Sequence, residues 1–443
     1  MSDLKDKIIG SWMGMAIGDA LGQSVKGLKP ETVKQYFKKV DGYHDVRPYI
    51  GKGIKQYRMA GLYGVQTQRA LAVCDSLLKT KKPSGEDLSD VLVRLSAHGP
   101  ENYFGMFRRP EGCFYKSVQD LPNRVRPLLA DQASAYACYF SMAMPLALYQ
   151  QRPSKTLMQY CIEAALLLSR HPWEVVGTAV TGFITTRLLN EEGLPDGAAL
   201  LNEAAEFCKT AEGWYRENYP DRFALQEKNP EAMSRTLSDL ADQVSQGSLE
   251  NLPGWICSNA SSYIKTEIVH ATQGHALTIL PLALVRLLMP GQDFASALTG
   301  TLNLGREADK LGALIGCWAG AVHGVSGIPQ DWQTGLVNSK EIKLRGEALA
   351  KRKKGVVGKD LLDMELGLTQ KEAEERRKYM PKELQKSAKK ASVLEDLWME
   401  EETEDTLPQL KEDPRRWREF ERDKTRKKRD RRRLLPGEGE ETC

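Results

Sequence analysis

Two stretches of this chain carry glycine at every fourth position, from Gly10 to Gly22 and from Gly312 to Gly324. Residues four apart lie on one face of an α-helix, and glycine has no side chain there, so a second backbone can approach closely. Each series therefore predicts a tightly packed helix. We expect the two helices to pack near each other.

Charged residues accompany both glycine series. Asp19 lies within the first series, and Glu307, Asp309 and Lys310 lie just before the second. A tightly packed helix holds the residues at its start in a fixed place. The two series therefore predict a polar site on a rigid pair of helices.

The pattern up to about residue 352 is helical. Apolar residues recur at three- and four-residue spacing, and proline or glycine breaks separate the segments. The clearest segments are Gln132 to Tyr149, Lys155 to Leu168, Trp173 to Asn190 and Ala198 to Ala211. Strand signals are scarce. We therefore expect an all-α fold, a compact domain of many helices.

The composition favours a cytoplasmic protein without a membrane span. The eight cysteines have no C-x-x-C spacing, which argues for reduced thiols rather than disulfides or zinc ligands. The longest apolar run, Leu311 to Pro329, approaches membrane length but contains His323 and five glycines. We expect a buried core helix there rather than a transmembrane segment.

The composition changes after Arg352. Residues 353–443 contain few apolar clusters, with an acidic block at Met399 to Thr406 and a basic block at Arg415 to Arg433. Such blocks are usually solvated helix or disorder. We expect a helical domain at 1–352 and a charged, partly disordered or helical extension at 353–443, which can be removed near Lys353 without loss of stability. The extension either neutralises its own charge or, as we prefer, binds a protein or nucleic-acid partner through 415–433.

A loop from Gly99 to Pro127 breaks the helical periodicity. It is rich in aromatic residues and arginine, among them Phe104, Phe107, Arg108 and Arg109. Such a loop could stack a base and hold a phosphate. It could equally cover the core, and the sequence leaves both interpretations open.

The two glycine series and their neighbours resemble the ADP-ribosylglycohydrolases, also called the dinitrogenase-reductase-activating glycohydrolase family. That family opens with G-D-A-L-G, here Gly18 to Gly22, and closes with a pattern that Asn303 to Ala321 follow, with Pro329 and Trp332 after it. Weaker matches, in the family's order, are Gly61 to Gln68, His171 with Pro172, and Ala276 to Leu288. The resemblance stops before the charged extension.

The resemblance implies a mostly helical hydrolase domain whose two magnesium ions bind an ADP-ribose-like group and position water at a glycosidic bond. Magnesium takes oxygen ligands, and several carboxylates are needed to hold two ions together. The family's Thr-Asp-Asp falls here on Gly64, Val65 and Gln66, and its Asp-x-Asp-Thr falls on Glu307, Ala308, Asp309 and Lys310. A further acid of some members falls near Lys26.

These departures from the family pattern favour a site without metal. Two carboxylates are lost and two lysines are gained, and a lysine a few ångströms from a divalent ion is repelled by roughly several kcal/mol. We therefore expect no magnesium cofactor. Instead, we expect Lys310, and with it Lys26, to pair with Glu307 and Asp309. The alternative is an ordinary surface salt bridge.

Two functions remain open. In the preferred one, the chain has lost the magnesium hydrolase chemistry and is a pseudoenzyme or assembly subunit that binds an ADP-ribose-like or nucleotide ligand, or a partner. In the alternative, it still hydrolyses glycosidic bonds to ADP-ribose or a related nucleotide, with Glu307 or Asp309 as general base. The candidate ligand-binding residues are Asp19, Lys26, Gln66, Thr67, His171 and Lys310. For His171, capping the helix that Pro172 begins is the competing role.

Overall fold

The computed structural model describes most of the chain before residue 380. The described residues are 3–52, 54, 57–101, 103–124, 129–131, 133–136, 139–223, 229–247, 249–264, 267–355 and 357–379. All of them belong to one compact unit, residues 1–389. The basic segment 415–433, predicted to bind a partner, lies outside the described residues.

The fold is all-α, as the sequence predicted, and the described residues form eighteen α-helices. They are α1 (Leu4–Gln23), α2 (Pro30–Phe37), α3 (Val65–Thr80), α4 (Gly85–Ala97), α5 (Gly112–Asp120), α6 (Ala143–Gln150), α7 (Lys155–Leu166), α8 (Pro172–Leu189), α9 (Gly197–Asn218), α10 (Pro220–Phe223), α11 (Ala232–Gln246), α12 (Leu252–Tyr263), α13 (Ala276–Leu287), α14 (Phe294–Leu302), α15 (Ala308–His323), α16 (Gln330–Gly335), α17 (Ser339–Ala350) and α18 (Leu361–Tyr379). Strand-like pairing in these parts of the chain is limited to isolated bridges, such as the one between Lys26 and Arg306.

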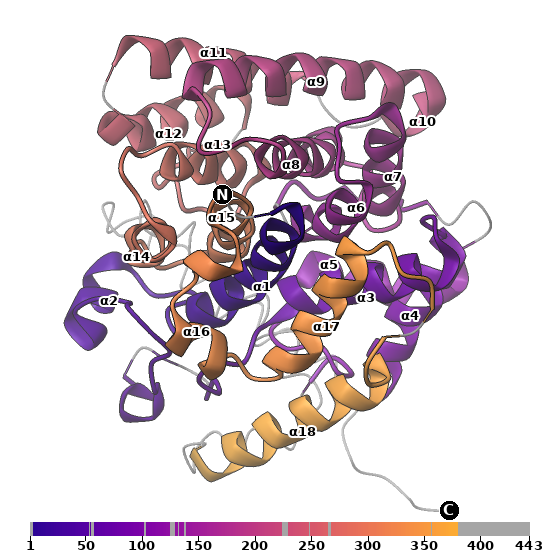
Figure 1. Ribbon diagram of the computed structural model, residues 1–443, viewed down its shortest axis with the longest axis vertical. Helices are drawn as coiled ribbons and strands as arrows, with labels where there is room; N and C mark the ends of the chain where they lie inside the picture. Colours follow the sequence, from indigo (N-terminus) through magenta and orange to yellow (C-terminus); the bar gives the residue numbers. More distant parts are fainter. Residues whose placement is uncertain are drawn as a thin grey trace, which may run out of the picture. The chain divides into compact units, whose positions relative to one another are not determined.

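The two glycine helices, α1 and α15, lie side by side at the centre of the fold (Figure 1). A Cβ atom built on Gly14 would lie 2.1 Å from the carbonyl oxygen of Gly316, and one built on Gly18 would lie 1.8 Å from that of Gly312. Residue numbers rise along one helix as they fall along its partner, so the helices are antiparallel. The predicted packing of the two glycine series is confirmed.

Other helices enclose this central pair. Helix α17 packs on α1, while α8, α13 and α14 pack on α15. Every residue of α15 from Ala308 to Ala321 is buried. The long apolar run is therefore a core helix, as expected. Across the described parts of the chain, the model contains no helix with the length and apolar character needed to cross a membrane.

The helix predicted from Gln132 begins later than the sequence suggested. Helix α6 starts at Ala143, after a short 3-10 turn from Phe140 to Met142. Two carbonyls before it bind other elements: that of Ala135 accepts a hydrogen bond from the backbone N–H of Ala276, and that of Tyr136 accepts one from Lys310 Nζ. These tertiary contacts take the place of helical hydrogen bonds.

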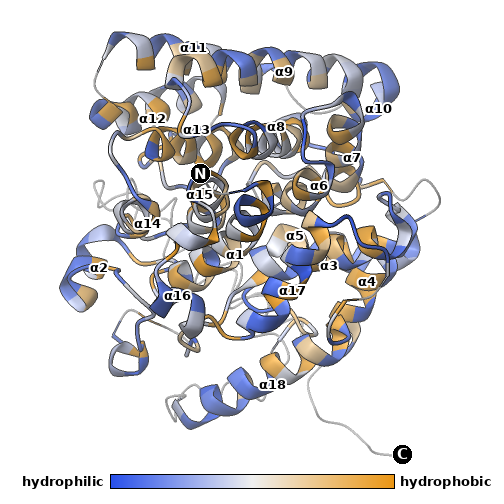
Figure 2. Ribbon diagram, in the orientation of Figure 1, coloured by the Kyte–Doolittle hydropathy of each residue, from blue (hydrophilic) through white to orange (hydrophobic). Residues whose placement is uncertain are grey.

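Helix α18 lies beyond the predicted domain boundary at 352 and packs against α3 and α4 of the body. It buries two carboxylates, Glu365 and Glu372, against the body. Glu365 Oε2 lies 2.7 Å from Arg108 Nη2, and both side chains are fully buried. Figure 2 shows that the second half of α18 is largely hydrophilic, which is why its sequence resembled a solvated tail. The body extends through α18 because buried arginines neutralise its acids.

We predict that Gly316→Ala destabilises the fold by about 1–3 kcal/mol, because the new methyl group would overlap the backbone of α1. Its Cβ would lie 2.0 Å from the carbonyl oxygen of Gly14. The control is Gly213→Ala within α9, where a Cβ would meet no atom within 4 Å. For Gly213→Ala we expect the free energy of unfolding to rise by up to about 1 kcal/mol, because alanine has a higher helix propensity than glycine. Urea denaturation measures both, and equal effects at the two positions would contradict the close contact.

We also predict that Glu365→Ala costs about 3–5 kcal/mol of unfolding free energy, because it leaves the buried guanidinium of Arg108 without its counter-ion. Glu374→Ala, on the exposed side of the same helix, is the control and should change stability by less than about 0.5 kcal/mol. Thermal melts of both variants make the comparison. A chain ending at Lys353 should melt well below one ending at Tyr379, contrary to the expectation from sequence alone.

Candidate functional site

The antiparallel packing of α1 and α15 brings the end of α1 against the start of α15. Asp19, near the end of α1, and Asp309, in the first turn of α15, are both fully buried. The first turn of α3 adjoins them, since its Thr67 bonds to Asp19. Residues that the sequence analysis singled out in three distant segments therefore meet at one place.

Two lysines form ion pairs with the acids of this site. Lys26 Nζ lies 2.9 Å from Asp309 Oδ2, and Lys310 Nζ lies 2.8 Å from Glu307 Oε2. The side chains of Lys26 and Lys310 are only 11% and 4% exposed. The predicted pairing of lysines with the surviving acids is confirmed. The low exposure rules out the alternative of an ordinary surface salt bridge.

The carboxylate of Asp19 is committed to neighbouring donors. Its Oδ2 accepts hydrogen bonds from the backbone N–H groups of Gly64 and Thr67 and from the Thr67 hydroxyl, at 2.8–3.0 Å. Its Oδ1 accepts one from Gln23 Nε2 at 2.7 Å. Burial and the nearby charge of Asp309 raise the pKa of Asp19, although these hydrogen bonds oppose the shift. Asp19 thus ties the start of α3 to the end of α1.

Glu111 is a member of this site that sequence reasoning missed. Its carboxylate accepts hydrogen bonds from Gln66 Nε2 at 2.9 Å and Arg69 Nη1 at 3.1 Å, and Lys310 Nζ lies 3.7 Å away. Burial works to raise the pKa of Glu111, but Arg69, Lys310 and Lys26 together hold it at about 2. Its position in the loop from Gly99 to Pro127 was the available signal, since that loop had already been singled out.

The same loop also serves the core. The aromatic rings of Phe104, Phe107 and Phe114 are buried, which agrees with the interpretation of a core-covering loop. Arg109 instead reaches the site, where its Nε donates to Gln23 Oε1 at 2.7 Å. Arg109 has a φ of 50°, a left-handed conformation that non-glycine residues adopt at a cost. The loop therefore covers the core and supplies charged groups to the site.

The two histidines near the site cap helices. His171 Nδ1 accepts a hydrogen bond from the backbone N–H of Trp173, and His275 Nδ1 accepts one from that of Leu277. Burial and the neighbouring His171 lower the pKa of His275 to about 3, so this imidazole is neutral at physiological pH. The capping role considered for His171 is present in the structure.

Aromatic and backbone atoms form the edge of the site beside Lys310. The carbonyl oxygen of Tyr136 accepts a hydrogen bond from Lys310 Nζ at 2.9 Å, while half of the Tyr136 side chain is exposed. A Cβ atom on Gly274 would lie 3.0 Å from the carboxyl carbon of Glu307. Glu307 is 22% exposed. The site therefore reaches solvent between Glu307 and Tyr136.

The residues present do not fit a pair of magnesium ions. The ammonium group of Lys26 stands 2.9 Å from Asp309, where it neutralises a carboxylate that a metal would need. Among the residues described, no group of three or more His, Cys, Asp or Glu side chains is arranged to hold an ion. Gly64 and Val65 offer no carboxylate, and the amide of Gln66 is bonded to Glu111 and Arg69.

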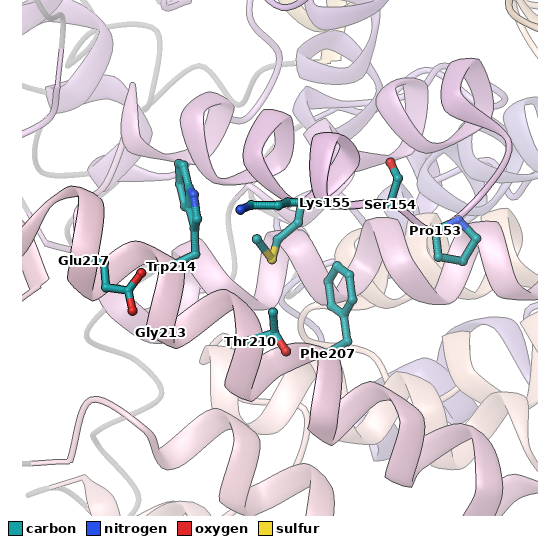
Figure 3. A pocket seen from close by; sticks show the side chains of 9 residues that line it. Pro153, Ser154, Lys155, Phe207, Thr210, Gly213, Trp214 and Glu217 are labelled. Atoms are coloured by element: carbon teal, nitrogen blue, oxygen red, sulfur yellow. The ribbon is translucent and has the colours of Figure 1, made fainter.

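A separate groove of about 610 Å³ lies between α7 and α9, away from these charged residues. Figure 3 shows the side chains of Lys155, Phe207 and Trp214 along it. Phe207 also stacks on Phe183, with ring centroids 4.6 Å apart. The sequence analysis had not singled out this groove.

Comparison with known proteins gives the family. Residues 1–361 match the model of the ADP-ribosylglycohydrolase family, and the chain belongs to that family. An uncharacterised protein of Archaeoglobus fulgidus is 22% identical over 340 residues, which cover 75% of this chain and 92% of the relative. A solved structure described as an ADP-ribosylglycohydrolase-related protein complex is similar with a TM-score of 0.55 and 22% identity, over 79% of this chain and 99% of the other. This last likeness is one of fold.

We predict that Glu111→Gln lowers the free energy of unfolding at neutral pH by roughly 3 kcal/mol, since each pKa unit of depression corresponds to about 1.4 kcal/mol. The pKa of Glu111 is depressed from an ordinary 4.5 to about 2, so its stabilisation is present above pH 4.5 and is lost as the pH falls towards 2. Chemical denaturation between pH 7 and pH 3.5 measures the free energy of unfolding of the native protein and of the variant. The difference between these two free energies should narrow only below pH 4.5. The control is the exposed Glu101→Gln in the same loop, and a pH-independent difference for Glu111→Gln would contradict the assignment.

Proposed function

We propose that this protein is a member of its family in which the motifs for two magnesium ions are degenerate, and that it acts by binding rather than by metal-dependent hydrolysis. The observation that carries the proposal is the pairing of Lys26 with Asp309 and of Lys310 with Glu307. Each lysine supplies, within the chain, positive charge that a metal would supply. A carboxylate bound to an ammonium group is a poor ligand for a divalent cation.

The charge of the site supports this proposal. Four ion pairs join Lys26 to Asp309, Lys310 to Glu307, Arg69 to Glu111 and Arg109 to Glu372. Each of these acids has a counter-ion within the chain, and Asp19 is held by neutral donors, so little negative charge remains to draw in and hold two divalent ions. Buried charges are retained when paired in this way.

The ligand that we propose is an ADP-ribose-like or nucleotide molecule bound without metal. The half-exposed ring of Tyr136 offers a surface on which a base or sugar can stack. Lys310 bonds to the carbonyl oxygen of Tyr136, and Glu307, whose side chain is 22% exposed, offers an acceptor for a polar group of the ligand. Of the other candidate residues, Gln66 bonds to Glu111 and His171 caps the start of α8.

A second candidate function is hydrolysis of a glycosidic bond to such a ligand without metal. Burial raises the pKa of Glu307 above its ordinary value, against the lowering effect of Lys310, and the side chain is 22% exposed. Those two properties suit a general base. Asp309 is less suited because it is fully buried. Release of free ADP-ribose by the native protein, abolished in Glu307→Gln, would favour this second function.

We predict that ADP-ribose binds equally well with magnesium and with a chelator, and that manganese alone gives no binding heat at millimolar concentration. Tyr136→Ala should weaken ADP-ribose binding about tenfold, the scale of one lost base–aromatic stack. The control is Leu344→Ala, an exposed apolar residue on α17, which should leave binding unchanged. Titration calorimetry measures all of these. Two manganese ions bound per chain, or ADP-ribose binding that requires the metal, would overturn the proposal.

We further propose that segment 415–433 binds an acidic protein or a nucleic acid, because twelve of its residues from Arg415 to Arg433 are lysine or arginine. A chain ending at Tyr379 should keep the melting temperature of the full chain but lose any association that weakens with salt. A pull-down at two salt concentrations tests this, and a partner retained equally by the shortened chain would contradict it.

A further inference from the structure

We propose that α18 is a strap that holds the charged loop of the site in place, and that its release from the body opens the site. The strap runs from Leu361 to Tyr379 and begins where the match to the family model ends. The strap would regulate access to the site described above. Only the identity of the ligand rests on the proposed function.

The strap is joined to the loop through two consecutive arginines. Arg108 is paired with Glu365 at 2.7 Å, and its Nη1 donates to the hydroxyl of Thr369 at 2.8 Å. Arg109 is paired with Glu372 at 2.9 Å. Burial works to raise the pKa of Glu372, but Arg109 and Arg108 lower it below its ordinary value, so this carboxylate stays charged. Two turns of α18 therefore hold adjacent positions of one loop.

The loop in turn is joined to the site. Arg109 Nε donates to Gln23 Oε1, and Gln23 Nε2 donates to Asp19. The carbonyl oxygen of Arg109 accepts a hydrogen bond from Lys26 Nζ at 3.3 Å, on the same ammonium group that pairs with Asp309. A continuous chain of polar contacts thus runs from Glu372 through Arg109 to the buried acids. Without the strap, Arg109 would have no counter-ion on this side and would lose what holds it in its left-handed conformation.

The way in which α18 is attached makes release plausible in physical terms. Its buried residues are Leu361, Met364, Glu365, Thr369, Glu372 and Ala373. Half of these are polar, so little apolar surface is lost when the helix leaves, and most of its attachment lies in ion pairs and hydrogen bonds. Desolvation offsets much of the attraction within a buried ion pair, so water that reaches both partners on release recovers part of the energy that is lost. Release of the strap would give α18 a second position besides the docked one in the structure.

Hydrogen–deuterium exchange of the full chain tests the strap without any ligand. In Glu372→Ala we expect exchange in residues 105–111 and 17–27 to become about tenfold faster than in the native protein, as local opening becomes easier. Exchange in α9 and α11, which pack against each other away from α18, should not change. The control is Glu374→Ala, which removes an exposed carboxylate two residues away. Glu372→Gln, which keeps the shape and an acceptor oxygen, should give a smaller effect.

The outcomes separate the strap from a merely structural helix. Faster exchange confined to the loop and the end of α1 supports the proposal. A uniform rise that includes α9 and α11 would mean that α18 only stabilises the whole body, and no change at 105–111 would mean that it does not hold the loop; both results overturn the strap. Calorimetry with ADP-ribose is read separately, since failure of the native protein to bind it would count against the proposed function and leave the exchange result valid.

Discussion

Every feature of the site depends on the direct backbone contact between α1 and α15. Because glycines face glycines along this contact, the two helix axes lie closer than side chains would allow, and their relative position is fixed along their length. Asp19 and Asp309 occupy the ends that this contact brings together. The contact also fixes the positions of Lys26 and Glu307, because Lys26 lies just after the end of α1 and Glu307 just before the start of α15.

The charged residues around this contact form a layered arrangement. Asp309 and Asp19 lie at the bottom and are inaccessible to solvent. Lys26 pairs with Asp309 and Lys310 pairs with Glu307, and Glu307 is the most exposed of these side chains. An isolated charge at this depth would be strongly unfavourable, so each buried charged group requires a partner of opposite charge or hydrogen-bond donors. This dependence makes the cluster specific in geometry even where its net contribution to stability is small.

The parts of this arrangement that follow from local pattern could be predicted from the sequence. The spacing of glycines predicted the helix pair, and the lysine beside acids at the start of α15 predicted the pair of Lys310 with Glu307, because each of these signals lies within a few residues. The pair of Lys26 with Asp309 joins residues 283 apart in the sequence, and its prediction came from the family pattern. Glu111, Arg69 and the contacts of α18 could not be predicted in this way. Their partners lie tens to hundreds of residues away along the chain, and single residues of this kind have no periodicity. Helix α18 was also misjudged because buried and solvated carboxylates are identical in sequence.

The pairing of Lys26 with Asp309 also constrains how the chain can change over evolutionary time. A metal-binding site could arise here only if the lysines were replaced and several carboxylates were added. Replacing Lys26 alone leaves Asp309 buried without a counter-ion, at a cost of about 3–5 kcal/mol, which is a large part of the roughly 5–15 kcal/mol that keeps a domain folded. Adding a carboxylate before the lysines are replaced would also destabilise the protein, because the new charge would be buried without a counter-ion. The ion pairs therefore disfavour the appearance of a metal-binding site, since each single substitution towards one passes through a less stable protein.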